Sequence, residues 1–129
     1  MPKIYQLLKG NPYVLPENLY RQILYLIKDY DRIKLQWSEE LYTSPGRDGG
    51  PRGSRISDPT FSKALKRLRL EEDLKAMDKA LTQIPEEYRE HVINHSRYGI
   101  RFPDWADRKT WFKYQSKYIF HVAENLKKV

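Results

Sequence analysis

The sequence contains no cysteine, which excludes disulfides, thiolate metal sites and cysteine nucleophiles. It also lacks an apolar run long enough for the hydrophobic region of a signal peptide or for a membrane span. Both absences are typical of a soluble protein in a reducing compartment, so we expect a cytoplasmic location. A chain of 129 residues is long enough for one compact domain with a helical arm.

Signatures of catalysis are missing as well. The glycines of the sequence do not form a phosphate-binding motif, and no nucleophile is paired with a base. His91 and His95 lie four residues apart, a spacing that can place two imidazoles on one metal ion, but a third ligand and the glutamate of a zincin helix are absent. Two polar or phosphate-facing histidines are the alternative. We therefore expect a protein that is not an enzyme and that has neither cofactor nor bound metal.

The charge is unbalanced towards lysine and arginine. These two residue types total 24 against 17 for aspartate and glutamate, which gives a net charge of +7. A polyanion such as nucleic acid is therefore the first partner to consider. Excess lysine also keeps many proteins soluble, so charge alone does not decide the question.

Hydrophobic periodicity divides the chain into helices and one long loop. Apolar residues recur at three- and four-residue steps from Pro16 to about Tyr42, which predicts one long helix. Residues 43–57 are rich in glycine and proline and predict a flexible loop that is either functional or a linker. Three arginines of this loop are candidates for phosphate contacts: Arg47, Arg52 and Arg55. The simpler interpretation is that the loop is only a hinge.

A second long helix is expected to begin at Asp58-Pro59, because the carboxylate can accept from first-turn amides and proline suits the first helical position. It carries two apolar stripes that are out of phase, so we expect it to contact two partners. The first stripe is Phe61, Leu65 and Leu68, and the second is Leu70, Leu74, Met77, Leu81 and Ile84.

The remaining sequence predicts two further helices. One spans Glu86 to about Ser96, and the last runs from Arg108 to about Lys127 with Asp107 at its start. The prediction is therefore an all-α protein that ends in a helix-turn-helix-like pair. Its parts are an N-terminal helical arm (1–42), the flexible loop (43–57) and a helical domain (58–129).

The last helix carries the feature that points to function. No acid occurs between Asp107 and Glu124, whereas four cations do: Arg108, Lys109, Lys113 and Lys117. Three of them lie four residues apart and form one ridge, flanked by hydrogen-bonding side chains from Thr110, Tyr114 and Ser116. An α-helix fits the major groove of DNA, where lysine and arginine can contact guanine or phosphate. The alternative is an ordinary amphipathic helix with a lysine-rich solvent face.

The surrounding sequence favours the DNA interpretation. From Tyr88 to Val129, nine lysines and arginines stand against four acids. The order of helix, tight turn and capped helix is the one that a helix-turn-helix requires. Arg97 and Arg101, in the turn before the last helix, are second candidates for phosphate contacts.

These residues resemble a known family. Ile84-Pro85-Glu86-Glu87-Tyr88-Arg89 looks like the helix that precedes the DNA-reading pair in region four of bacterial sigma factors. The fuller resemblance, over most of the chain, is to the RinA/ArpU-like phage transcription regulators. The matching segments are Pro51-Arg52-Gly53-Ser54, Ser57-Asp58-Pro59-Thr60, Phe102-Pro103 with Ala106, Lys109-Thr110, Tyr114, Tyr118-Ile119 and Val122-Ala123.

The resemblance implies a sequence-specific regulator of phage or prophage genes that binds double-stranded promoter DNA, and therefore a location at the nucleoid of a bacterial host. It places Arg108, Lys109, Thr110, Lys113 and Lys117 in the recognition helix. RNA polymerase and a second copy of the chain are further candidate partners. Two alternatives remain open at this point: a module that contacts RNA polymerase, and a DNA-binding packaging protein similar to a small terminase subunit. The sequence departs from the sigma pattern between Pro103 and Ala106, where a full helix is expected.

Overall fold

The computed structural model describes residues 11–42 and 59–129, and within these ranges the chain contains helices and no strand. The predicted all-α class is confirmed. The expected loop, with Arg47, Arg52 and Arg55, lies outside the described residues. No helix in the described ranges is long and apolar enough to cross a membrane. The helices are α1 (Glu17–Lys28), α2 (Tyr30–Tyr42), α3 (Pro59–Leu81), α4 (Glu86–Tyr98) and α5 (Arg108–Asn125).

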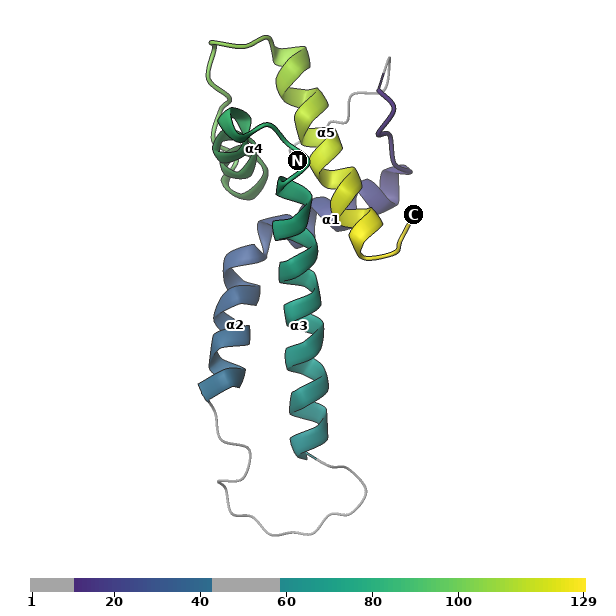
Figure 1. The fold of residues 1–129 in the computed structure, drawn as a ribbon, viewed down its shortest axis with the longest axis vertical. Coiled ribbons are helices and arrows are strands. Elements are labelled where there is room, and N and C mark those ends of the chain that lie inside the picture. Colours follow the sequence, from purple (N-terminus) through teal and green to yellow (C-terminus); the bar gives the residue numbers. More distant parts are fainter. Residues whose placement is uncertain (1–10, 43–58) are drawn as a thin grey trace.

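The long helix expected from Pro16 to Tyr42 is two helices. The break lies at Asp29, whose amide donates to the carbonyl oxygens of Tyr25 and Leu26 at 3.1 Å each. The Asp29 carboxylate accepts a hydrogen bond from Arg32 Nη2 at 2.8 Å and so supports the first turn of α2. The chain changes direction at this point, and α2 leads away from α1 (Figure 1).

One core holds α1, α4, α5 and the C-terminal half of α3 together, and we call this part the head. The segment expected as a separate arm therefore contributes its first half, α1, to the helical domain. Figure 1 shows α5 running alongside the upper part of α3. The largest fully buried apolar side chains of the core are Ile23, Ile27, Met77, Ile84, Val92, Trp111, Tyr118, Ile119 and Val122.

The second half of the expected arm, α2, lies beside the N-terminal half of α3, and both extend away from the head (Figure 1). We call α2 and residues 59–70 of α3 the distal arm. Tyr30 and Ile33, at the start of α2, are buried in the same core, and further along the pair the Arg67 guanidinium lies 5.1 Å from the ring centroid of Trp37. Of the two apolar stripes predicted on α3, the second reaches the core through Leu74 and Met77. The first is exposed.

The end of α4 depends on a glycine. Gly99 has a φ of 69°, its amide donates to the His95 carbonyl oxygen at 3.0 Å, and the Ile100 amide donates to that of Asn94 at 3.3 Å. This left-handed residue is the usual way to close a helix and to satisfy its last carbonyl groups. It also turns the chain back towards α5.

We expect Gly99→Ala to lower the free energy of unfolding by about 1 kcal/mol, because alanine is strained in the left-handed region. A Cβ at Gly99 would meet no atom within 4 Å, so the loss should come from the backbone alone. Urea titration measures it. Gly99→Asn is the control and should lose less, since asparagine tolerates this conformation. Equal stability of the alanine variant and the unchanged protein would contradict a left-handed conformation at Gly99.

Candidate nucleic-acid interface

Helix α5 is anchored by one face and exposes the opposite one. Trp111, Tyr118, Ile119, Val122 and Ala123 are fully buried and form its inner face. The helix begins after Asp107, whose carbonyl oxygen accepts from the Trp111 amide at 3.1 Å. The Asp107 carboxylate makes no capping hydrogen bond. The capped start that the sequence predicts for this helix is therefore not present at Asp107.

The open part of the cationic ridge is the first two turns of α5. Lys109 and Lys113 are exposed, and neither forms an ion pair within the described residues. Thr110 beside them is half-buried. Lys117 is also half-buried, with its Nζ 5.8 Å from the ring centroid of Tyr13.

Tyr13 belongs to the short segment before α1 and packs against the C-terminal half of α5. Its ring centroid lies 5.6 Å from that of Phe120 and 5.8 Å from that of His121. This segment therefore covers the C-terminal end of the cationic ridge. Lys117 is therefore less available to a large partner than Lys109 and Lys113.

Arg108 separates from the lysine ridge. Its guanidinium lies 5.8 Å from the ring centroid of Phe112, and it lines a cleft of about 620 Å³ at the N-terminal end of α5. Arg101, which is exposed, lines the same cleft. Two of the predicted cations therefore meet here from different segments. The carboxylates of Asp104 and Asp107 also border the cleft.

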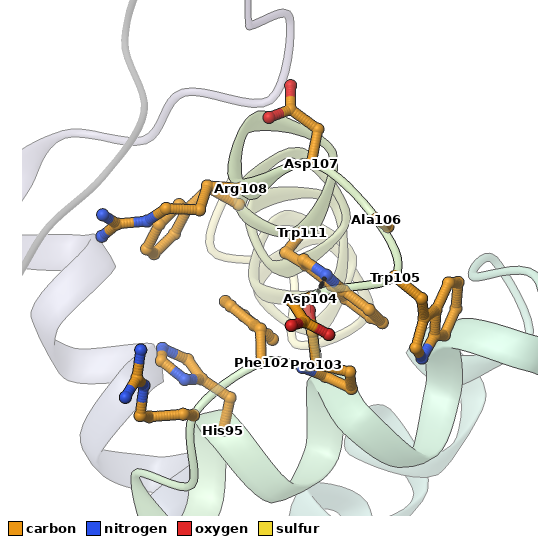
Figure 2. Close-up of a pocket in the computed structure, with 11 residues that line it drawn as sticks. His95, Phe102, Pro103, Asp104, Trp105, Ala106, Asp107, Arg108 and Trp111 are labelled. Atoms are coloured by element: carbon orange, nitrogen blue, oxygen red, sulfur yellow. Dashed lines mark hydrogen bonds between the residues drawn. The ribbon is translucent and has the colours of Figure 1, made fainter.

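The aromatic residues of this cleft were not predicted as part of the site. Phe102 stacks on His95, with ring centroids 3.9 Å apart, and lies parallel to Trp111 at 5.1 Å. In Figure 2, Arg108 and His95 lie to one side of Phe102, and Trp105 lies to the other. The sequence does contain a signal for this cluster, namely the many aromatic and histidine residues between His91 and Phe112.

The stacked rings hold the connection between α4 and α5. Trp111 Nε1 donates to the Pro103 carbonyl oxygen at 2.9 Å, and the Trp105 ring lies 4.9 Å from that of Trp111. This connection, residues 99–107, is longer than the three- or four-residue turn of a helix-turn-helix. The predicted pair therefore differs from that motif in its turn, and aromatic packing fixes the geometry instead.

Ser116 is a correction to the predicted site. Its side chain is 2% exposed, so it cannot flank the ridge as a surface hydrogen-bonding group. It follows Phe112 by four residues and precedes Ile119 by three, which places it at the edge of the buried face. The neighbouring Gln115 is buried too, and its Nε2 donates to Ser96 Oγ at 3.4 Å.

Arg97 is a second correction. Its guanidinium carbon lies 3.6 Å from the ring centroid of Tyr30, and its Nε is buried. Arg97 therefore links α4 to the start of α2 and does not face outwards to a phosphate. Tyr114 is half-buried, with its ring centroid 4.5 Å from that of Tyr88. Most of its ring is therefore part of the packing between α4 and α5.

The histidines of α4 contact aromatic rings. The His91 ring centroid lies 5.7 Å from that of Trp111, and His95 Nδ1 donates to the Ile100 carbonyl oxygen at 2.9 Å. Within residues 11–42 and 59–129, no group of three histidine, aspartate or glutamate side chains is placed to hold a metal ion. His95 instead joins α4 to the wall of the cleft.

Burial lowers the pKa of His95 below its ordinary value of 6.5; the bond to Ile100 opposes this effect and Lys28 adds to it. The folded protein therefore favours the neutral imidazole, whereas the unfolded chain binds a proton near its ordinary pKa. The stability that His95 contributes is complete above that value and is lost as the pH falls from it through the lower pKa of the folded state.

We expect the free energy of unfolding to fall as the pH is lowered past about 6.5, the ordinary pKa of histidine, and His95→Gln to reduce this fall. Denaturant titrations at several pH values measure both. The same pH dependence in the variant and the unchanged protein would show that His95 does not cause it.

The chain was compared with models of protein families, with curated proteins and with solved structures, and none of them matches it.

Proposed function

We propose that this protein is a regulator of transcription that binds duplex DNA with the N-terminal half of α5 and with Arg101. The observation that carries the proposal is the pair of exposed lysines, Lys109 and Lys113, on a helix with no acid between residues 108 and 123. Regulation of transcription, and the phage or prophage setting, rest on the resemblance to the RinA/ArpU-like regulators described above.

The charges at the start of α5 run against the stability of the helix. The positive end of a helix dipole favours acids, and the first turns of α1, α2 and α4 contain them. The first turn of α5, like that of α3, contains no acid; it contains Arg108 and Lys109, directly after the carboxylate of Asp107. Each cation there costs about 0.3–1 kcal/mol. Residues that oppose local stability are typical of functional sites, and two cations in the first turn of a helix suit a phosphate as partner.

The geometry supports contact with a duplex. The back of α5 is fixed to the core, so the helix can present Lys109 and Lys113 without unfolding its neighbours. Side chains four residues apart on a helix lie about 5–6 Å apart, and the major groove is about 12 Å wide. Arg101 and Arg108 stand at the end of the helix, where an inserted helix passes the phosphates at the edge of the groove.

Selection from a pool of random-sequence duplexes tests the proposal. We expect one enriched sequence, bound at least about a thousandfold more tightly than random duplex at the same salt concentration. Single strands of the enriched sequence should compete poorly, because the reading of bases in the major groove requires paired strands. Enrichment of no sequence, together with equal affinity for single strands, would contradict a sequence-specific regulator.

A further inference from the structure

One apolar surface of the protein has no place in the core or in the proposed DNA contact. It lies on the distal arm, where Phe61 is 61%, Leu65 46% and Leu68 52% exposed. The spacing of these residues places them in one row on α3. The other side of the same stretch of α3 faces α2, where Arg67 meets Trp37. We call this row the outer stripe.

The outer stripe is more than a scatter of surface side chains. Single exposed leucines are normal on soluble proteins, but a row of large apolar residues on one helix marks an interaction surface. Anchors at positions i, i+4 and i+7 are the pattern with which one helix packs against another. Leu74 and Met77, further along α3, are buried in the core, so the stability of the head does not depend on the outer stripe.

The charge of this part of α3 indicates the kind of partner. Residues 59–70 contain no acid, although Glu72 follows one turn after Leu68. Of their cations, Arg67 lies against Trp37 of α2, whereas Lys66 and Arg69 are exposed next to Leu65 and Leu68. A second copy docked through the same stripe would bring like charges together. A nucleic acid would suit the cations but would leave the leucines without apolar contacts, because phosphate contacts are polar.

We infer that the outer stripe binds an acidic amphipathic helix of another protein. The apolar side of that helix packs on Leu65 and Leu68, and its flanking carboxylates lie near Arg69, one turn from Leu65. The contact is remote from Lys109 and Lys113, since the distal arm extends away from the head (Figure 1). The inference is therefore independent of DNA binding, and each can fail without the other.

A labelled synthetic peptide tests the inference in the full-length protein. The peptide is about 15 residues long, with leucines in one helical row and glutamates on the remaining faces. A matched peptide carries lysine in place of every glutamate. We expect the acidic peptide to bind at least about tenfold more tightly than the lysine peptide, as measured by fluorescence anisotropy. Equal affinity for the two peptides would overturn the inference.

Three variants locate the contact. Leu65→Ser combined with Leu68→Ser should weaken binding of the acidic peptide at least about tenfold, whereas Leu35→Ser, at a leucine of α2 that is 61% exposed, should not. Arg69→Glu should reverse the preference between the two peptides. All of these side chains are exposed, so we expect unchanged circular dichroism.

Two further measurements test whether a second copy of the chain or duplex DNA, and not another protein, occupies the outer stripe. Light scattering should report a monomer; a dimer that the double serine variant dissociates would assign the outer stripe to a second copy and overturn the inference. The same variant should retain full affinity for duplex DNA. If it loses that affinity, the outer stripe belongs to the DNA contact, and a separate protein partner is excluded.

Discussion

Combining Lys109→Glu with Lys113→Glu should lower the affinity for duplex DNA more than about a hundredfold, because two phosphate contacts become two repulsions. Both side chains are exposed and unpaired with described carboxylates, so the core should be unaffected. A glutamate in the first turn of α5 even suits the helix dipole. The measurement is a fluorescence titration of labelled duplex, with circular dichroism to verify the helical content.

The control combines Lys75→Glu with Lys79→Glu, two exposed lysines on α3, and its one local cost is the surface ion pair between Lys75 and Glu71, which contributes little to stability. It makes the same change in net charge at a different place. We expect it to weaken binding only a few fold, through the general field of the protein. If both pairs of substitutions weakened binding equally, the effect would come from total charge, and α5 would not be the contact surface.

Trp111→Ala should remove about 3–5 kcal/mol from the free energy of unfolding, the usual loss for a large aromatic side chain in a core. Trp111 is fully buried, stacks on Phe102 and donates its Nε1 hydrogen to the Pro103 carbonyl oxygen. The substitution therefore removes the packing that fixes both α5 and the connection before it. Urea titration measures the loss.

Trp105→Ala is the control for this prediction. Trp105 is 53% exposed and contacts Tyr88 and Trp111 through its ring edges and faces, so we expect a loss of about 1 kcal/mol. Equal losses for the two tryptophans would mean that the aromatic cluster does not hold α5 in the way described.

The helices were predictable wherever their ends carry a local chemical signal. Pro59 and Pro85 mark two starts, and Gly99 marks an end, because each acts through its own backbone. The break at Asp29 was not predictable in the same way. Aspartate fits within a helix, and the apolar period continues across it, since the buried residues Ile23, Ile27, Tyr30 and Ile33 follow one another at three- and four-residue steps.

The candidate site was predicted only in part. The exposure of Lys109 and Lys113 follows from helical spacing alone. The half-burial of Lys117 depends on Tyr13, more than one hundred positions earlier in the chain, and no local pattern indicates that contact. The cleft depends on an irregular segment that brings Arg101 towards Arg108. The error at Ser116 was avoidable, because its spacing from Phe112 and Ile119 already places it on the inner side.

The salt dependence of DNA binding tests the role of α5 most directly. If Arg101, Arg108, Lys109 and Lys113 each neutralise one phosphate, the slope of log affinity against log salt should be about −3.6. Affinity should then fall roughly a hundredfold between about 50 and 200 mM salt. Replacing Lys109 and Lys113 with alanine should reduce the slope to about −1.8. An unchanged slope in this variant, or no binding by the unchanged protein at about 50 mM salt, would contradict a DNA contact through α5.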